Sequence, residues 1–401
     1  MDYSAKFPAL FLMLFLMSQC LNAGWVPQSG NTTNTLNSLC FVNSSTGWIA
    51  GNSGTILKTT NGGTNWTTQT SGTLVNLNSI SFTNTGIGWV CGDAGTVKKS
   101  VDYGNTWMSQ SVTTSNRFSD VFIVDQNTVY LVGDNVFYRT TNGGSVWTTV
   151  AGWGGNYLHF TSAATGFNVG GNQMNKTVNQ GTNWTVVYEG AYGLGKVMFP
   201  TSNTGYSGSG NGTFIKTVTG GINWTSYSTG VTNDLTDAYF LDGLTGYMIG
   251  SGGSVIKTTN GGSNWSVQNS GTTGGLSEIW FTDVNNGWIA GSSGTILHTS
   301  NGGVGIQNIP GIIPSSCSLK QNYPNPFNPS TKIQFEIPKS SSVKINIIDI
   351  TGRVLEVIAD EHLPAGAYEV IWNASNFPSG IYFYSMKSGE FSSTKKMMLV
   401  K

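Results

Sequence analysis

A tryptophan that recurs at nearly even intervals is the feature that most constrains the fold of this chain. It ends a short motif, T-N-G-G-x-x-W and variants of it, at Trp66, Trp107, Trp147, Trp184, Trp224 and Trp265. A basic residue stands eight positions earlier, at Lys58, Lys99, Arg139, Lys176, Lys216 and Lys257. Self-similarity with a period of about 40 residues predicts an array of repeated four-strand units.

The last unit lacks its tryptophan, and the missing residue is found at the other end of the chain. His298 holds the basic position of that unit, and Ile306 stands where the tryptophan is expected. Counting one repeat back from Trp66 reaches Trp25, and the sequence after it, W-V-P-Q-S-G, resembles W-T-T-Q-T-S-G after Trp66. An array whose last strand is its own N-terminus closes into a ring, which removes exposed strand edges. We therefore predict an all-β chain: a seven-bladed β-propeller over residues 24–308, closed by the N-terminal strand, and then a small immunoglobulin-like β-sandwich.

The first strand of each unit alternates with period two and supplies the predicted core between blades. One apolar column contains Leu39, Ile80, Val121, Leu158, Val197, Ala238 and Ile279. Just before this column stands a polar or aromatic position, filled by Ser38, Ser79, Asp120, Tyr157, Lys196, Asp237 and Glu278. We expect these side chains to form a ring near one mouth of the central channel.

Composition and the N-terminus restrict the environment and the partners. Lysines and arginines (19) equal aspartates and glutamates (19), so the basic surface on which nucleic-acid binding depends is missing. Residues 1–23 have a basic start, a short apolar run and a small residue, Ala23, which is typical of a secretory signal peptide. Cleavage near Ala23 removes Cys20 and leaves no transmembrane segment, and a lipoprotein signal in which Cys20 is the lipidated residue is the alternative. Cys40, Cys91 and Cys317 remain without metal-like spacing, so we expect free thiols and neither a metal nor a cofactor.

The second unit contains S-V-D-Y-G-N-T-W (Ser100–Trp107), and here the chain resembles the Asp-box (BNR) repeat family. A short Asp or Asn side chain can bond backbone amides in a tight turn, while the tryptophan packs beneath it. We therefore assign the box a structural role rather than a catalytic one. The residues concerned are Asn61, Trp66, Asp102, Trp107, Asn142, Trp147, Trp184, Trp224, Asn260, Trp265 and Trp25.

Residues 24–308 also resemble the photosystem II assembly-factor type of Asp-box propeller. The resemblance lies in the motifs GW-[IV]-x-G, G-T-[IV]-x-K-T and N-G-G-x-x-W. It implies a scaffold that binds an assembling protein complex. That family carries an arginine-rich patch, whereas this propeller has only Arg117 and Arg139, so we expect its fold here but not its photosynthetic role.

The C-terminal part differs in composition and is predicted to be a separate domain. We expect a linker over residues 309–320 and short alternating strands over residues 321–401. The latter segment closely resembles the type A C-terminal sorting domain of the type IX secretion system, through residues that include Asn325, Pro326, Gly352, Arg353, Gly380, Tyr382 and Lys401. The resemblance implies export through the periplasm to the cell surface or the medium, with the secretion machinery as a partner. An ordinary immunoglobulin-like binding domain is the alternative.

Catalytic chemistry finds little support in the sequence. A sialidase needs an arginine cluster for the carboxylate of its substrate, and two propeller arginines cannot supply one. A glycosidase needs two carboxylates, for which the ring position offers Asp120, Asp237 and Glu278. A solvated mouth of variable sequence, a ligand or cation site, and a catalytic pair are the three interpretations, in that order of preference.

Loops that lead from one unit into the next are the other candidate binding residues. They gather on one face of a propeller and contain Arg117, Trp153, Tyr157, Glu189 and Tyr192, which suit carbohydrate or protein recognition. The first hypothesis is accordingly a non-enzymatic exported module that binds an extracellular protein or polysaccharide. A polysaccharide hydrolase that uses the mouth carboxylates, and a purely structural surface protein, are the alternatives.

Overall fold

The computed structural model of the chain describes residues 24–150, 154–303, 306–309, 311–312, 314–374 and 377–401. These residues form two compact units, which divide after Gly303. The signal-peptide prediction (residues 1–23, with Cys20 and Ala23) and Trp153 lie outside the described residues. Among the residues that are described, no helix has the length and apolar character needed to cross a bilayer.

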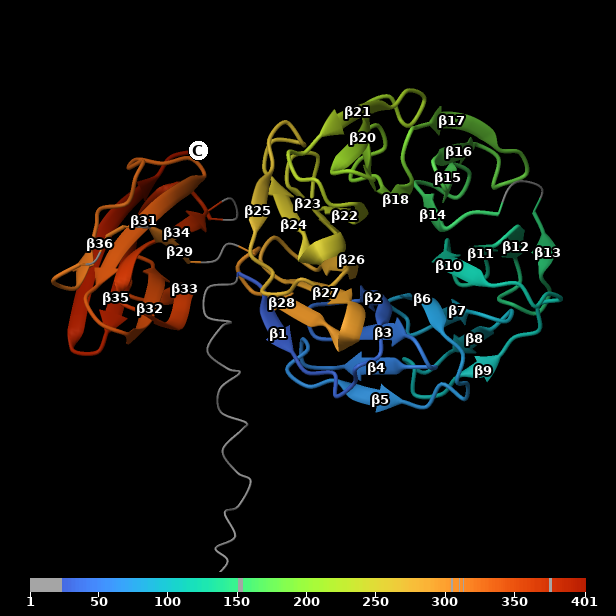
Figure 1. Cartoon of the computed structure of the whole chain (residues 1–401), viewed down its shortest axis with the longest axis horizontal. Helices are drawn as coiled ribbons and strands as arrows, with labels where there is room; N and C mark the ends of the chain where they lie inside the picture. The colour runs from blue at the N-terminus through green and yellow to red at the C-terminus, as the bar shows by residue number, and fades with distance from the viewer. Residues whose placement is uncertain (1–23, 151–153, 304–305, 310, 313, 375–376) are drawn as a thin grey trace, which may run out of the picture. The chain divides into compact units, whose positions relative to one another are not determined.

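In the described part of residues 25–303, the strands form seven four-stranded antiparallel sheets arranged around a ring (Figure 1). The inner strands are β2 (Leu36–Phe41), β6 (Leu77–Phe82), β10 (Phe118–Ile123), β14 (Tyr157–Phe160), β18 (Leu194–Met198), β22 (Leu235–Phe240) and β26 (Leu276–Phe281). The second strands are β3 (Gly47–Gly51), β7 (Gly88–Gly92), β11 (Val129–Gly133), β15 (Gly166–Gly170), β19 (Gly205–Ser209), β23 (Gly246–Gly250) and β27 (Gly287–Gly291).

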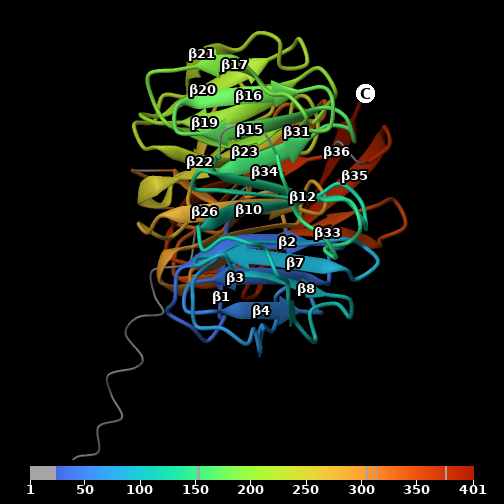
Figure 2. The same ribbon diagram turned by 90° about the vertical axis from the view of Figure 1, so that its right-hand side faces the viewer.

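The third strands are β4 (Ile56–Thr59), β8 (Val97–Ser100), β12 (Val136–Thr140), β16 (Gln173–Thr177), β20 (Thr213–Thr217), β24 (Val255–Thr258) and β28 (Ile296–Thr299). The outer strands are β5 (Thr67–Gln69), β9 (Met108–Ser109), β13 (Thr148–Thr149), β17 (Thr185–Glu189), β21 (Thr225–Ser228), β25 (Ser266–Gln268) and β1 (Val26–Gln28). Strands β2, β3 and β4 follow one another in one sheet, and all three are labelled in the side view of Figure 2.

The N-terminal strand closes the ring. β1 pairs with β28, with Val26 opposite His298, so the last sheet has the order β1-β28-β27-β26. Its inner strand β26 contacts both β22 and β2, which makes the contacts between inner strands continuous around the ring. Trp25 is fully buried and packs edge-on against Phe281, with ring centroids 5.7 Å apart. The N-terminal tryptophan therefore fills the position that the seventh repeat leaves empty.

Adjacent sheets are joined by stacked aromatic rings and by close backbone approach. Trp288 stacks on Phe41 of the next sheet at 3.9 Å, and Trp48 stacks on Phe82 at 3.7 Å. The glycine before the aromatic residue is needed because the phenylalanine ring covers it: a Cβ on Gly47 would lie 2.6 Å from the ring of Phe41. The box tryptophan completes the cluster, since Trp66 packs edge-on against Phe41 at 5.9 Å.

The box is a hydrogen-bonded turn between the third and outer strands. Thr59 Oγ1 donates to Asn61 Oδ1 (3.0 Å) and accepts from the Gly63 N–H (2.8 Å), and Asn61 Oδ1 accepts from the Asn65 N–H (2.9 Å). The same bonds recur in other turns at Asp102, Asn142, Asn179 and Asn260. Thr219 takes the place of the Asn side chain in the fifth sheet. The Thr219 hydroxyl accepts the hydrogen bond from the Asn223 N–H (3.0 Å) that an Asn or Asp side chain accepts in the other turns.

The second unit is a β-sandwich, and it begins earlier than the sequence predicted. One sheet has the order β29 (Gln307–Ile309), β34 (Gly366–Asn373), β31 (Ser330–Ile337), β30 (Ser318–Leu319). The other has the order β33 (Val354–Leu363), β32 (Ser341–Ile348), β35 (Gly380–Ser388), β36 (Phe391–Leu399). The linker was expected at residues 309–320, where the structure instead has β29 at the first end and β30 near the second, paired with β34 and β31. Ile306, placed at the end of the propeller, is 2% exposed in the sandwich core.

The residues matched to the sorting signal hold the ends of the sandwich strands. Asn325 precedes the cis proline Pro326, and its Oδ1 accepts from the Met398 N–H (3.0 Å). Gly352 has φ +87° in the turn where Arg353 pairs with Asp349 at 3.1 Å. At Gly380 strand β35 begins, Tyr382 Oη donates to the Pro378 carbonyl (2.7 Å), and the Lys401 N–H donates to Ser379 Oγ (3.0 Å).

Candidate functional site

Side chains at one position of the inner strands join neighbouring sheets around the central channel. Ser38 Oγ accepts from the Ile80 N–H (3.1 Å), and Ser79 Oγ accepts from the Val121 N–H (3.3 Å). Asp120 Oδ2 accepts from the Leu158 N–H (2.9 Å). In each pair the acceptor reaches the backbone of the next inner strand. We call the residues at this position, Ser38, Ser79, Asp120, Tyr157, Lys196, Asp237 and Glu278, the ring layer.

The ring layer continues across the seam between the last sheet and the first. Asp237 Oδ2 accepts from the Ile279 N–H (2.9 Å), and Glu278 Oε2 accepts from the Leu39 N–H (2.8 Å). The other oxygen of Glu278 pairs with Lys196 Nζ at 2.6 Å. Each of these carboxylates therefore has a structural partner on a neighbouring sheet.

A solvated, variable mouth was the favoured interpretation of this ring, and the burial of Ser38, Ser79, Asp120 and Asp237 differs from it. Asp120 and Asp237 are 8% and 3% exposed. Buried carboxylates that accept backbone N–H bonds are satisfied, whereas free ones would be costly.

Burial controls the protonation of the ring layer. Burial raises the pKa of Asp237 to about 7, although the ammonium group of Lys196 opposes this. Burial likewise raises the pKa of Asp120. Burial alone would lower the pKa of Lys196, but the carboxylates of Glu278, Asp237 and Asp120 outweigh it and raise that pKa.

A polar cavity of about 340 Å³ lies on one side of the ring layer, at the mouth where the inner strands begin. Arg117, Tyr157 and Lys196 line it, together with amide side chains that belong to the residues just before the ring layer. Asn37 Nδ2 donates to the Leu77 carbonyl at 2.8 Å, for example. We call this the mouth cavity. Arg117 is tethered there by Asp93 (3.5 Å) and Asp134 (3.4 Å) and remains half-exposed.

A second cavity, of about 290 Å³, lies where the inner strands continue past the ring layer. Its walls include Phe122, His159, Tyr239 and Trp280, two positions further along each strand. Asp120, Asp237, Glu278 and Lys196 line it as well. We call this the axial cavity. The structure thus brings the predicted carboxylates together with Lys196, which was not singled out as a site residue.

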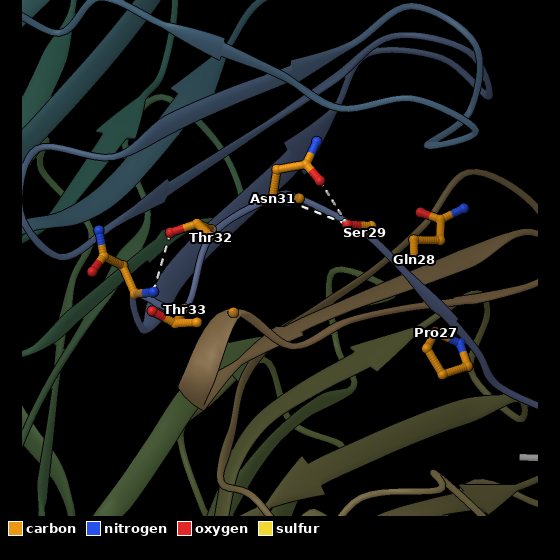
Figure 3. A pocket seen from close by; sticks show the side chains of 9 residues that line it. Pro27, Gln28, Ser29, Asn31, Thr32 and Thr33 are labelled. Carbon is orange, nitrogen blue, oxygen red and sulfur yellow. Dashed lines mark hydrogen bonds between the residues drawn. The ribbon is translucent and has the colours of Figure 1, made fainter. Parts of the chain in front are cut away.

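The remaining predicted residues do not join either cavity. Glu189 ends β17 and is exposed, and Tyr192 is 46% exposed in the loop between β17 and β18. A surface hollow beside β1 is lined by residues 27–34 and Gly294 (Figure 3). Many of its polar groups already have partners: the Asn34 N–H donates to Thr32 Oγ1 (3.1 Å), and Asn34 Nδ2 donates to Thr55 Oγ1 (2.9 Å), so we do not regard it as a site.

The basic residue of each repeat has a role that the sequence analysis missed. Lys99 Nζ donates to the Gly143 carbonyl (2.7 Å) in the box turn of the next sheet and lies 5.1 Å from the ring of Trp89. Lys176, Lys216 and Lys257 make the equivalent bonds. The constant spacing of eight residues between the basic residue and the box tryptophan was the signal in the sequence. Only the ring arrangement shows that the basic side chain bonds to the box turn of the next sheet.

Comparison with known families assigns both units. The profile described as photosynthesis system II assembly factor YCF48 matches residues 17–153 and 222–311, more than half of the chain. The chain belongs to this family. The profile of the secretion system C-terminal sorting domain matches residues 321–401, so the YCF48-like propeller carries a type IX sorting domain. A comparison with curated proteins gave no match.

Solved structures with the same fold include two of YCF48. One, YCF48 bound to a D1 peptide, has a TM-score of 0.61 and 19% identity and covers 69% of this chain and 97% of its own. The other, YCF48 from Cyanidioschyzon merolae, has a TM-score of 0.59 and 19% identity, with coverage of 69% and 98%. The extracellular domain of the putative one component system BT4673 from B. thetaiotaomicron has a TM-score of 0.56 and 10% identity, with coverage of 94% and 59%. An all-β propeller followed by a β-sandwich is therefore confirmed.

Proposed function

We propose that the protein is an exported, non-enzymatic binding module whose propeller recognises an extracellular protein. The observation that carries the proposal is the engagement of the ring-layer carboxylates. Asp120, Asp237 and Glu278 each accept backbone N–H bonds from a neighbouring sheet, and Glu278 also pairs with Lys196. A glycosidase also needs a carboxylate that is free to attack or to activate water, and Glu278, which is held by the Leu39 N–H and by Lys196, is poorly suited to that task.

The mouth cavity is the proposed recognition surface. Arg117 and Tyr157 line it, and the flanking amide side chains can donate and accept hydrogen bonds. The exposed ring of Tyr192 adds an aromatic contact near the same strand starts. A protein with this fold binds a peptide in the YCF48 structure with D1, which favours a polypeptide over a polysaccharide as ligand.

The test uses the chain from residue 24 to residue 401. Candidate extracellular proteins, peptides and polysaccharides are screened by the shift in melting temperature, and the polysaccharide wells are assayed for released reducing ends. A ligand that binds only the native state raises stability by about 2.7 kcal/mol at a hundredfold excess over its Kd. We expect a shift with a polypeptide and no released sugar.

Three variants test whether the ligand binds at the mouth cavity. Tyr192→Ala and Arg117→Ala should weaken binding about tenfold or more. Tyr227→Ala is the control, because Tyr227 is equally exposed (47%) but lies on an outer strand, β21. Release of reducing ends that Glu278→Gln abolishes would instead establish the hydrolase alternative.

A further inference from the structure

The axial cavity combines an excess of negative charge with aromatic walls. Three carboxylates, of Asp120, Asp237 and Glu278, line it, and Lys196 is the basic side chain among its lining residues. Charges removed from water are costly unless they are compensated. One ammonium group does not balance three ionised carboxylates, so a bound cation would favour the ionised form of Asp237, whose pKa burial raises to about 7.

The remaining polar groups of the cavity also favour a hydrogen-bond donor. Lys196 Nζ already donates to Glu278 Oε1, and Tyr239 Oη donates to the Phe281 carbonyl (2.7 Å). The imidazole of His159 makes ring contacts with Phe122 and Phe199 but has no hydrogen-bond partner among the described residues. Burial lowers the pKa of His159 to about 4, so at neutral pH one ring nitrogen is a free acceptor.

The walls suit an organic cation better than a metal ion. Among the described residues no group of three His, Cys, Asp or Glu side chains is placed to hold a metal. The rings of Tyr239 and Trp280 lie 5.7 Å apart on one wall, and aromatic faces attract ammonium and guanidinium groups. Solvent reaches this level of the channel, since the side chains of Lys196 and Glu278 are 19% and 12% exposed.

We propose that the axial cavity is a binding site for a cationic amine or guanidinium group on a short alkyl stem. The charged head lies against Asp237 and the unpaired nitrogen of His159, and the stem packs on the aromatic walls. The group belongs either to a free amine or to a lysine or arginine side chain of a polypeptide. The axial cavity lies on the other side of the ring layer from the mouth cavity and shares Lys196 with it. The proposed cation site uses Asp237 and His159, which do not line the mouth cavity, so it can be tested separately from the proposed function.

The test measures binding of small probes to the chain of residues 24–401 by titration calorimetry. The probes are n-butylammonium and methylguanidinium, with n-butanol as the neutral control of similar shape. We expect n-butylammonium to bind at least about tenfold more tightly than n-butanol. Equal binding of the amine and the alcohol would overturn the proposal.

Variants locate the site. Asp237→Asn should weaken n-butylammonium binding about tenfold, while Asp234→Asn should leave it unchanged, since Asp234 is exposed at the start of the same sheet. His159→Leu is the second variant, because it spares the hydrogen bond that Asp237 accepts from Ile279. Amine binding that persists in both variants would place the site elsewhere and refute the assignment.

Peptides distinguish the two sources of the cation. Acetyl-Gly-Lys-Gly-amide and acetyl-Gly-Arg-Gly-amide are compared with acetyl-Gly-Gln-Gly-amide. Binding of the cationic peptides, but not of the glutamine peptide, supports a polypeptide side chain as the occupant. Binding of n-butylammonium alone supports a free amine.

Discussion

At the scale of single residues, chemically different side chains in the ring layer make the same hydrogen bond to the next inner strand. Serine at positions 38 and 79 and aspartate at positions 120 and 237 all accept an N–H bond from the next inner strand. A hydroxyl does this without charge, whereas a carboxylate brings a charge into a place with little water. The choice of carboxylates therefore costs stability that serines would not, which is consistent with a role in binding.

The protonation of Asp237 should make stability depend on pH. Its pKa in the folded state, about 7, lies above the ordinary value of about 3.9, so the folded state holds this proton more tightly. That contribution is fully present below about pH 4 and is lost as the pH rises through 7. Urea unfolding from pH 4.5 to 7.5 should show wild type losing on the order of 3 kcal/mol relative to Asp237→Asn.

Asp102 is the control for this experiment, because its pKa is lowered in the folded state whereas that of Asp237 is raised. Hydrogen bonds from Thr106 and Ser100 lower its pKa to about 2, so its contribution is lost only in acid below the tested range. The difference between wild type and Asp102→Asn should stay constant from pH 4.5 to 7.5. A constant difference for Asp237→Asn as well would show that Asp237 is ionised throughout this range.

At the scale of elements, the strand β1 decides whether the ring is closed. Only residues 26–28 of this strand pair with β28. The residue just before the strand, Trp25, packs against Phe281 and Tyr247. Without β1, strand β28 would present an unpaired edge, and such edges promote association with other chains. We therefore expect the buried side chain of Trp25 to stabilise the closed ring more than the three-residue strand that follows it does.

Truncation of that side chain should destabilise the propeller strongly. Trp25→Ala should lower the free energy of unfolding by about 3–5 kcal/mol, because a large side chain is removed from a fully buried site. Trp107→Ala is the matched control, since Trp107 holds the same box position but is only half-buried. Denaturant unfolding followed by fluorescence gives both values. An equal or smaller loss at Trp25 would mean that the last sheet holds together without it.

At the scale of the whole molecule, the chain consists of two compact units that divide after Gly303. The boundary falls inside the last repeat rather than after it. Ile306 and β29 follow the repeat pattern in sequence but belong to the sandwich in space. The sorting-domain profile begins at residue 321, whereas the folded unit includes residues from before that point.

A charge at Ile306 should therefore affect one unit alone. Ile306→Asp places a carboxylate in the sandwich core, where an unpaired charge is poorly tolerated, so we expect a loss of at least about 3 kcal/mol in that unit. Scanning calorimetry of the chain should show the sandwich transition moving to lower temperature while the propeller transition stays in place. A shift of the propeller transition instead would show that Ile306 packs in the propeller and would contradict this assignment.

The sequence by itself determined the repeat, the β-propeller class, the closure by Trp25 and the sorting domain. These features are encoded locally: a regular repeat period, a turn motif and strand alternation can be read without knowing which residues meet. Only the tertiary structure decided the roles of Asp120, Asp237, Glu278 and Lys196, because their partners lie on neighbouring sheets, and Lys196 and Glu278 are 82 residues apart. It also moved Ile306 into the second unit, since a buried apolar residue at a domain boundary fits either core equally well by composition, and only packing assigns it to one.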